Sequence, residues 1–371
     1  MIIKSIELSH FRNYNKQVIA FGEGINLLFG QNAQGKTNVL EALYIAATGK
    51  SHRSNNYNDL IQYGQTGFEI KLEALIDQRP TDIVIKYAKE KGRYAEINGI
   101  KRSKLSDILG TLNMILFSPE TLDVVKGSPA ERRKFIDVLL CQTNRQYLHN
   151  LQQYNGIIKN KSLALKKSSG EQKYKDVIPV WNEQLAQFGS RIAYTRMKTI
   201  ERLNQYMQHE IHHISSGKEL SQLIYKTFCP MDASFGPEDF EEALRQKLDK
   251  NMAKEMALSQ CLYGTHRDDF EILLNDMNSR QYCSQGQQRS LALALIISEL
   301  LFVESIRGEK PVLLLDDVMS ELDTKRQEYL LEGLYDVQTL ITATDDVPYS
   351  GIKGKAVTRF FVENGCVSLK S

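Results

Sequence analysis

Residues 30–37 have the spacing of a phosphate-binding loop, G-x-x-x-x-G-K-[ST], with every defining position filled. In such a loop the glycines turn successive backbone N–H groups inward, and the N-terminus of the next helix adds positive potential. Lys36 would reach the β- and γ-phosphates of a nucleoside triphosphate, and the Thr37 hydroxyl would coordinate Mg²⁺. The other residues of this segment that we expect to contact the nucleotide are Gly30, Gln31, Asn32, Ala33, Gln34, Gly35 and Asn38.

A second pair of candidate residues, Asp316 and Asp317, follows the apolar run 312–315. Four consecutive apolar residues are typical of a parallel strand that is covered on both faces. Asp316 would hold the Mg²⁺ shell, and Asp317 would polarise the attacking water as a general base. Taken alone, the pair could equally be two solvated acids at the end of a core strand, but the loop at 30–37 favours the nucleotide site.

The elements that must position these residues follow from hydrophobic periodicity. An apolar strand at 24–29 and an apolar helix at 38–45 flank the loop, which disfavours a glycine-containing turn that matches by chance. Further strands are expected at 2–8, 18–21, 69–75, 82–87, 93–97, 100–101, 113–117, 270–274, 280–283, 338–343, 358–363 and 366–369. Helices are expected at 130–140, 144–166, 180–213, 237–256, 290–303 and 325–335.

This layout predicts a head that is interrupted by an insert. Residues 1–122 would form the N-terminal part of the head with the phosphate loop, 123–262 an inserted helical arm, and 263–371 the C-terminal part of the head. The arm is too short for the hundreds of heptad residues of a long coiled-coil tether, and prolines interrupt it.

The segment 284–289, Ser-Gln-Gly-Gln-Gln-Arg, opens the helix 290–303, and Ser-Glu-Leu-Asp at 320–323 follows the acidic strand. This order of motifs resembles that of the ABC-type ATPases. The resemblance implies that Ser284, Gly286 and Gln287 bind the γ-phosphate held by a second subunit, so that ATP joins two copies. Gln285 departs from the glycine that is usual in ABC transporters, and an ordinary N-cap is the alternative interpretation.

Four further segments make the resemblance more specific. They are Leu-Ser-His-Phe-Arg-Asn-Tyr at 8–14, Phe-Ser-Pro-Glu at 117–120, Lys-Gly-Ser-Pro-Ala-Glu-Arg-Arg-Lys-Phe-Ile-Asp at 126–137, and His-Arg-Asp-Asp at 266–269. Over nearly its whole length the chain resembles the bacterial RecF family, which is related to the Rad50 and SMC heads. The implied fold is α/β: an ABC-type P-loop ATPase head, with a mixed sheet and an antiparallel β-subdomain, and an inserted all-helical arm domain.

The resemblance also implies a function. A RecF-like protein would bind duplex or gapped DNA in recombinational repair, replication restart and the SOS response, and would help to load RecA on single-stranded gaps. ATP with Mg²⁺ would drive head-to-head dimerisation, and slow DNA-stimulated hydrolysis would release the dimer. The implied partners are RecR, RecO and, indirectly, RecA.

Individual head residues take expected roles by the same resemblance. Arg12 and Asn13 would approach the nucleotide. Residues 118–120 occupy the place of the Q-loop, but no glutamine stands there, which argues against a direct Mg²⁺ contact. Residues 342–346 lack the switch histidine of many ABC ATPases, so hydrolysis should be slow. The role of 266–268 stays open between an ion-paired turn and a function.

Charge is unevenly distributed along the chain. Residues 126–202 carry a net charge of +9, which leaves −7 for the remainder of a protein whose total is +2. A basic region favours nucleic acid, because each phosphate contact releases condensed counterions, although a solvated lysine-rich helix face is equally compatible. The candidate DNA-binding residues are Lys126, Arg132, Arg133, Lys134, Lys159, Lys161, Lys166 and Lys167.

Composition favours a cytoplasmic protein. Five cysteines without a C-x-x-C pair indicate reduced thiols and argue against a zinc site. The seven histidines are taken to have no ligand spacing, with the adjacent 212–213 pair as a surface feature. No secretory segment opens the sequence, and the apolar stretch 291–303 is too short to span a bilayer. The alternatives to the implied function are the ATPase subunit of a transporter and a structural DNA clamp that does not hydrolyse ATP.

Overall fold

The computed structural model describes residues 1–371 apart from 169–170, 230–233, 335, 347–355 and 371. The chain divides into two compact units. The first, here the head, comprises Met1–Leu122 and Arg289–Ser371, and the second, here the arm, comprises Asp123–Gln288. The arm runs past residue 262, where the sequence suggests that the insert ends, because strands after that point pair with a strand of the arm.

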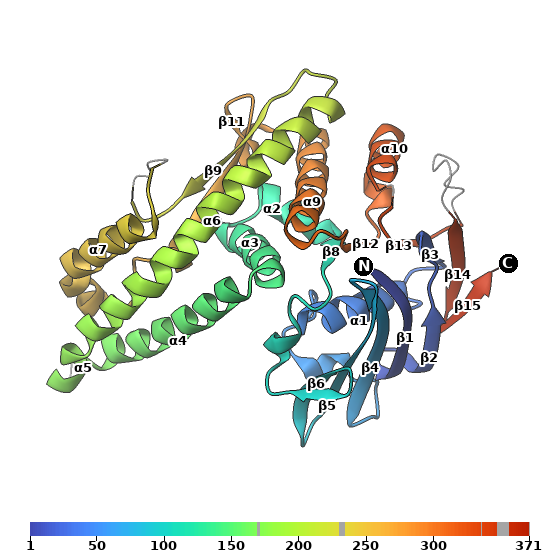
Figure 1. The fold of residues 1–371 in the computed structure, drawn as a ribbon, viewed down its shortest axis with the longest axis horizontal. Coiled ribbons are helices and arrows are strands. Elements are labelled where there is room, and N and C mark those ends of the chain that lie inside the picture. The colour runs from blue at the N-terminus through green and yellow to red at the C-terminus, as the bar shows by residue number, and fades with distance from the viewer. Residues whose placement is uncertain (169–170, 230–233, 335, 347–355, 371) are drawn as a thin grey trace. The chain divides into compact units, whose positions relative to one another are not determined.

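One layer of the head is a six-stranded sheet in the order β15-β14-β3-β13-β12-β8 (Figure 1). All neighbours are parallel except β15, which pairs antiparallel with β14. Every residue of β3, β12 and β13 is buried, as expected for parallel strands covered on both faces. The bounds are β3 Ile25–Phe29, β8 Met114–Phe117, β12 Val312–Leu315, β13 Thr339–Ala343, β14 Val357–Glu363 and β15 Cys366–Lys370.

The other layer is an antiparallel sheet in the order β2-β1-β4-β5-β6-β7. Burial alternates along β4, so one face of this sheet lies on the core. Its strands are β1 Ile2–Phe11, β2 Tyr14–Ala20, β4 Gly67–Ile76, β5 Arg79–Ala88, β6 Gly92–Ile97 and β7 Ile100–Arg102.

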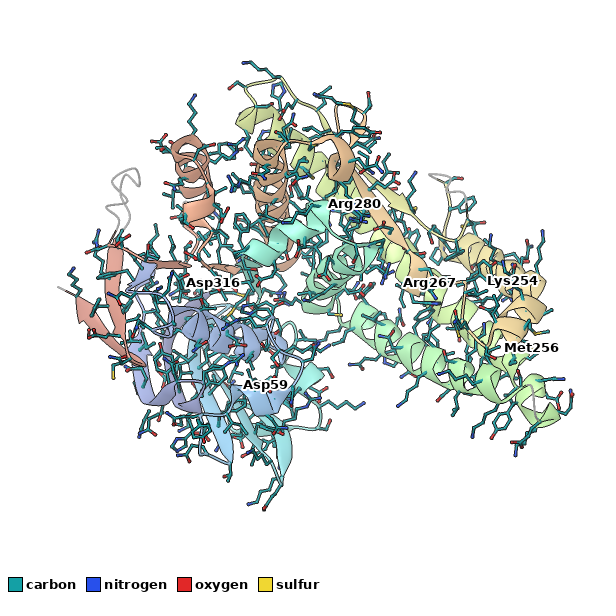
Figure 2. The ribbon with its side chains drawn as sticks, turned by 180° about the vertical axis from the view of Figure 1, so that it is seen from behind. Asp59, Lys254, Met256, Arg267, Arg280 and Asp316 are labelled. Atoms are coloured by element: carbon teal, nitrogen blue, oxygen red, sulfur yellow. The ribbon has the colours of Figure 1, made fainter. Side chains whose placement is uncertain are left out.

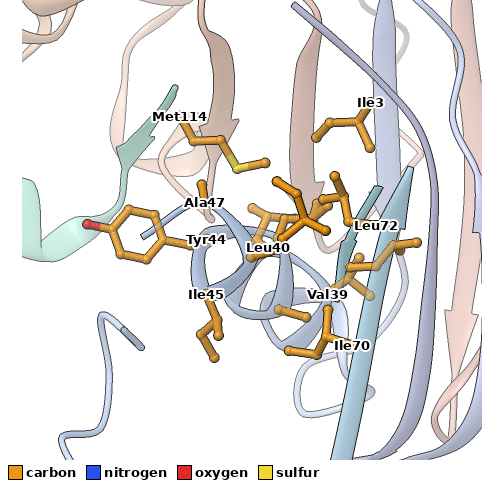
Figure 3. Close-up of a cluster of buried hydrophobic side chains, with 14 of the residues drawn as sticks. Ile3, Val39, Leu40, Tyr44, Ile45, Ala47, Ile70, Leu72 and Met114 are labelled. Carbon is orange, nitrogen blue, oxygen red and sulfur yellow. The ribbon is translucent and has the colours of Figure 1, made fainter. Parts of the chain in front are cut away.

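Helix α1 (Lys36–Thr48) lies in the core of the head and is apolar nearly all round. Figure 3 shows Leu40 and Ala47 of α1 near Met114 of β8, and Val39 near Ile70 of β4. A helix that is buried on every side is fixed by packing rather than by its own propensity. It therefore holds the segment that precedes it in a fixed position.

Two further α-helices, α9 and α10, contribute to the head. Helix α10 (Thr324–Gly333) begins at Asp323, whose side chain accepts from the Arg326 N–H. Helix α9 (Gln285–Arg307) starts within the arm and continues into the head, where its central residues are buried. Single-turn 3₁₀ helices lie at Tyr57–Leu60, Leu105–Ile108, Pro119–Thr121 and Met319–Glu321.

The arm contains the four long helices that the sequence predicts, and α4 and α6 run side by side in it (Figure 1). It also contains a three-stranded sheet in the order β11-β10-β9, of which β9 (Ser221–Lys226) was not expected. The strand predicted at 280–283 is wrong, because these residues belong to the turn of helix α8 and its end. The bounds are α2 Leu122–Lys126, α3 Pro129–Thr143, α4 Arg145–Lys167, α5 Gln172–Asp176, α6 Ile178–Ile214, α7 Pro237–Leu258, a 3₁₀ turn Thr265–Arg267, β10 Asp269–Leu274, β11 Met277–Asn278 and α8 Ser279–Tyr282.

In the part of the chain that the structure describes, every helix is too short or too polar to cross a membrane.

Candidate nucleotide site

The predicted phosphate loop joins β3 to α1. Gly30 and Gly35 have φ angles of 148° and 120°, a region that only glycine adopts readily, and Ala33 is left-handed at 65°. A Cβ atom on Gly30 would lie 2.3 Å from the carbonyl oxygen of Val362 in β14. The first glycine is therefore required both by its conformation and by the strand beside it.

Lys36 is buried at the first position of α1. Its ammonium donates to the carbonyl oxygens of Gly30 at 2.5 Å and Gln31 at 2.8 Å. Because an ammonium has three donors, Lys36 can keep a loop contact while donating to a phosphate. Burial lowers the pKa of Lys36, against the opposing effect of the carboxylates of Asp317 and Asp316.

Three polar side chains and one backbone N–H group meet where β12 and β13 end beside the start of α1. The Thr37 hydroxyl donates to Asp316 Oδ1 at 2.8 Å, and the Thr342 hydroxyl donates to the same oxygen at 2.8 Å. The backbone N–H of Asp317 donates to Thr342 Oγ1 at 2.9 Å. Asp316, labelled in Figure 2, is 5% exposed and follows β12 directly. Thr342 thus joins the acidic strand to its neighbour, a role that the sequence did not assign to it.

The oxygens of Thr37 and Asp316 suit a small, hard cation. Mg²⁺ prefers oxygen ligands at about 2.0–2.1 Å in octahedral geometry, which places neighbouring ligands roughly 2.9 Å apart. The observed separation of 2.8 Å between these two oxygens matches that spacing. Both residues can therefore serve as adjacent ligands of one ion.

A cavity of about 330 Å³ opens above the loop. Its walls come from the loop, the start of α1 and the ends of the two neighbouring strands. A cavity of this size, with the N-terminus of α1, the Lys36 ammonium and the Arg53 guanidinium in its lining, is suited to a polyphosphate. The lining residues are Asn32, Ala33, Gly35, Lys36, Thr37, Asn38, Arg53, Asp317 and Thr342.

Asp317 faces this cavity from a strained position. Its φ angle of 56° is left-handed, which is uncommon for a residue other than glycine and is found often at functional sites. Burial raises the pKa of the Asp317 carboxyl, and the negative charge of Asp316 adds to the effect, while Lys36 opposes it. A carboxylate with a raised pKa is a better proton acceptor as long as it remains ionised.

Asn13 supports the loop from outside rather than lining the cavity. Its amide donates to the carbonyl oxygen of Gln34 at 2.8 Å, and Asn38 donates to Asn13 Oδ1 at 2.8 Å. The loop is also tied to the hairpin between β14 and β15, because the N–H groups of Asn364 and Gly365 donate to the side chain and carbonyl of Gln34.

Arg12 binds the first helix instead of pointing into the cavity. Its guanidinium forms two hydrogen bonds with the carboxylate of Glu41, at 2.9 and 2.8 Å, and a third with the Asp59 carbonyl. Glu41 is fully buried in α1, so this pair attaches the turn after β1 to the helix. The structure gives Arg12 a positioning role, and the nucleotide contact expected for it stays a prediction.

Arg53 is a cavity residue that sequence reasoning missed. It donates to Asn38 Oδ1 at 3.0 Å and lies 3.7 Å from Glu41. The segment after α1 has no motif that marks it, so only the fold brings this cation to the cavity. Its side chain is 41% exposed and belongs to the cavity lining, so an anion in the cavity would meet this positive charge.

The Q-loop-like segment forms a separate cluster in the head. Ser118 caps the turn Pro119–Thr121, and its N–H donates to Thr121 Oγ1 at 3.0 Å. Burial alone would raise the pKa of Glu120. Hydrogen bonds from Ser118 and from the backbone outweigh this effect, and together with the nearby His52 they lower the pKa. These residues do not line the cavity above the loop.

The signature-like residues lie at the start of α9, in the arm. Ser284 and Gln287 form a reciprocal cap: the Gln287 N–H donates to Ser284 Oγ at 3.3 Å, and the Ser284 N–H donates to Gln287 Oε1 at 2.9 Å. The amide of Gln287 also donates to Glu219 at 2.8 Å. Gly286 lies between them in the first turn of α9. The N-terminus of a helix is an anion-binding element, so this turn can contact a phosphate.

The basic candidates of the arm fall into two groups. Arg132 makes a two-bond pair with Asp269, and Lys161 pairs with Glu255 at 2.6 Å with both side chains fully buried. These two residues have a structural role, since buried cations cannot reach a DNA phosphate. Arg133 is half-buried and donates a hydrogen bond to the carbonyl oxygen of Asp268. The candidates that are exposed are Lys126, Lys134, Lys159, Lys166 and Lys167.

The open segment 266–268 is an internal polar cluster. Asp268 is 3% exposed and accepts from the hydroxyls of Tyr225 and Thr227. Burial raises the pKa of Asp268 to about 6 and lowers the pKa of His266 to about 4. His266 Nδ1 lies 2.8 Å from the hydroxyl oxygen of Tyr154, at hydrogen-bond distance. The segment therefore holds parts of the arm together.

Comparisons with known proteins agree with this geometry. The model of the RecF/RecN/SMC N terminal domain matches residues 2–367. The DNA replication and repair protein RecF of Clostridium tetani is 39% identical over 366 residues, which cover 98% of this chain and 99% of that protein. The RecF of Acetivibrio thermocellus is 38% identical over 348 residues, covering 93% and 94%.

Solved structures with a similar fold include a RecF protein and an Smc head. The recombination mediator protein RecF-ATP in the RecFOR pathway matches with a TM-score of 0.93 and 34% identity, covering 100% of this chain and 98% of that one. An Smc head bound to the C-winged helix domain of ScpA matches with a TM-score of 0.57 at 18% identity, which shows a common fold alone. The predicted ABC-type head with a helical insert is therefore confirmed, and the chain belongs to the RecF family.

Proposed function

We propose that this chain is an ATP-dependent DNA-binding protein of replication and recombinational repair. The observation that carries the proposal is the cavity above residues 30–37, where Lys36, Thr37, Asp316 and Asp317 converge. The names of its relatives, DNA replication and repair protein RecF, and a relative's structure described as RecF-ATP support the same function. They favour it over the ATPase subunit of a transporter.

Each side chain has a task in nucleotide binding and hydrolysis. The loop N–H groups and Lys36 would neutralise the phosphates, and Arg53 would add a further positive charge at the cavity wall. Thr37 and Asp316 would hold Mg²⁺, which supplies electrostatic stabilisation of the phosphoryl oxygens. Asp317 would accept the proton of the attacking water, and Thr342 keeps the Asp317 backbone in place.

ATP would act as a switch for dimerisation. The N-terminus of α9, with Ser284, Gly286 and Gln287, is an anion-binding element that a second copy can present to the γ-phosphate. Because a ligand shifts an equilibrium only by its preference for one state, about 5.5 kcal/mol of shared contacts would suffice for a near-complete switch. Hydrolysis is proposed to be slow and stimulated by duplex DNA, and it would release the dimer.

The DNA-binding surface is proposed to be the exposed lysines of the arm. Lys159, Lys166 and Lys167 lie on α4, with Lys126 and Lys134 on α2 and α3. Exposed ammonium groups spread along helix surfaces suit contact with the phosphate backbone, which positions a protein on DNA without carrying sequence information. RecR, with RecO and RecA further along the same process, are the proposed protein partners, and the RecFOR pathway of the similar structure supports them.

The decisive experiment sizes the protein by light scattering with ATP, with ADP and with neither. A dimer with ATP alone is expected, and Lys36→Arg and Lys36→Met should remain monomeric while staying folded by circular dichroism. Phosphate release with and without duplex DNA then separates the switch from a non-hydrolysing clamp. A wild-type protein that remains monomeric with ATP at every concentration, or a Lys36→Met variant with unchanged ATP-dependent DNA binding, would refute the proposal.

A further inference from the structure

The C-terminal end of α6 carries a histidine pair that the nucleotide function does not use. Residues 209–213, His-Glu-Ile-His-His, match H-E-x-x-H, a pattern that places two imidazoles on one face of a helix. In the structure His209 Nε2 and His213 Nε2 are 3.2 Å apart, with ring centroids separated by 4.4 Å. The expectation that the histidines show no ligand spacing is therefore wrong for this pair.

Glu210 fixes the tautomer of the first imidazole. Its carboxylate lies 3.1 Å from His209 Nδ1, and its side chain is only 8% exposed. An ionised carboxylate can only accept, so Nδ1 carries the hydrogen and Nε2 keeps its lone pair. That lone pair points at His213. A carboxylate behind a histidine is the arrangement that orients metal-ligating imidazoles.

The two nitrogens have the separation that a shared ion requires. With metal–nitrogen distances of about 2.0–2.1 Å, atoms 3.2 Å apart subtend an angle of about 100° at the ion. This angle lies between octahedral and tetrahedral values. The hydrogen bond between the two rings holds one proton, and an ion that takes its place would gain both lone pairs. The C-terminal end of a helix also favours positive charge.

We propose that His209 and His213 chelate one divalent transition-metal ion from the Ni²⁺, Cu²⁺ and Zn²⁺ group. Imidazole suits these metals, whereas Mg²⁺ and Ca²⁺ prefer oxygen. Among the described residues no group of three or more His, Cys, Asp or Glu side chains could hold a metal ion, so water would complete the coordination by this pair. A neighbouring cavity of about 540 Å³ has His209 and His212, but not His213, among its lining residues, and it gives that water room on the His209 side.

The site is a binding site and not a peptidase centre. In metallopeptidases with this motif the glutamate acts as the general base on a metal-bound water. Here Glu210 is nearly buried and engaged with His209, so its carboxylate serves to orient that ring. Its role is therefore that of a positioning residue.

The test is calorimetric titration of the full chain with NiCl₂, which the hard oxygen site at Thr37 and Asp316 does not favour. The wild type should bind one equivalent, and His209→Ala and His213→Ala should each fall to the background of the double variant. Glu210→Gln should weaken binding about 10–100-fold, the usual effect of losing an outer-shell partner. Circular dichroism establishes that each variant is folded.

His212→Ala is the matched control, because it removes an exposed imidazole from the same turn. Its ring centroid lies 6.1 Å from that of His213, against 4.4 Å for His209, so wild-type binding is expected. If His212→Ala weakens Ni²⁺ binding as much as His213→Ala, or if His213→Ala has no effect, the pair is not the site. These outcomes do not depend on ATP and leave the proposed DNA-repair function untouched.

Discussion

The hydroxyl of Thr37 donates to Asp316 at 2.8 Å, although 279 positions separate the two residues in the chain. The sheet explains this contact. β3 and β12 both run parallel to β13, so the residues after each strand emerge at one edge. The two motifs that the sequence identifies separately therefore form a single cluster of oxygen ligands.

Asp316→Asn should abolish Mg²⁺-dependent hydrolysis while leaving the head folded. An asparagine still accepts hydrogen bonds from Thr37 and Thr342, but it no longer supplies the negative charge. Phosphate release in the presence of duplex DNA is expected to fall about 100-fold or more, since metal stabilisation contributes several kcal/mol. Binding of a fluorescent ATP analogue serves as the control and should change little. Unchanged turnover would exclude Asp316 as a metal ligand.

Asp317→Asn should separate dimerisation from turnover. Asp317 accepts a proton in the proposed reaction, so its loss leaves ATP binding and the ATP-dependent dimer intact while hydrolysis stops. In the wild type the raised pKa of Asp317 means that protonation removes the base at a higher pH than for an ordinary aspartate. The rate of phosphate release should therefore decline as the pH falls toward and through that pKa. A rate that does not respond to Asp317→Asn would assign the proton to another group.

Glu41→Ala should destabilise the head through a buried charge. Glu41 is fully buried and is held by Arg12 and by a 2.5 Å bond from Ser51. Removing the carboxylate leaves the Arg12 side chain, which is 21% exposed, without this partner, and such a loss typically costs about 1–3 kcal/mol. Urea unfolding should show a loss of this order, whereas Glu23→Ala, which removes an exposed partner of Lys4, should change stability little. Equal effects of the two variants would show that Arg12 and Glu41 do not anchor the turn.

His266 should make the arm sensitive to acid. Burial lowers its pKa to about 4 from the ordinary 6.5, so between these values the unfolded chain binds a proton that the folded chain does not. The free energy of unfolding is therefore highest above pH 6.5 and declines as the pH falls. The loss due to His266 should reach about 3 kcal/mol at pH 4. His266→Gln keeps a polar partner for Tyr154 and should show a shallower decline in urea unfolding between pH 6.5 and 4. Parallel curves for the two proteins would contradict this assignment.

Exposed lysines of α4 should govern the salt dependence of DNA binding. Replacing Lys159, Lys166 and Lys167 by alanine would remove three proposed phosphate contacts and should reduce the slope of log affinity against log salt by up to about 3. Fluorescence anisotropy with a labelled duplex measures this slope. The control is alanine at Lys4, Lys16 and Lys71, which removes the same charge from exposed sites of the head. If the control reduces the slope equally, net charge rather than the arm surface is responsible.

Local motifs made the phosphate loop, the acidic strand and the order of elements predictable. Each depends on a few consecutive residues whose backbone requirement or burial is visible in sequence, such as Gly30, Gly35 and the apolar residues before Asp316. The role of Thr342 and Arg53 could not be predicted, because their contacts arise only when distant strands and loops are brought together. No periodicity distinguishes either residue from its neighbours.

The net charge of residues 126–202 overstates the positive charge at the surface for a related reason. Lys161 and Lys166 are chemically identical in the sequence, yet one is buried against Glu255 and the other is exposed. Arg196, which contributes to the same positive total, is also buried, with Asp137 as its partner at 2.7 Å. The partner of an ion pair can lie almost a hundred residues away, so a net charge over a segment overstates the charge that reaches the surface. The pair of His209 and His213, by contrast, is visible in the sequence, because the two residues are four positions apart on an expected helix.

The hydrogen bonds from Asn364 and Gly365 to Gln34 have a consequence for biosynthesis. A ribosome releases Gln34 early, but the hairpin that braces it emerges more than three hundred residues later. These contacts to the phosphate loop can thus form only after translation of this chain has passed Gly365. Until then, Gln34 lacks two of the hydrogen bonds that fix the phosphate loop in the finished protein.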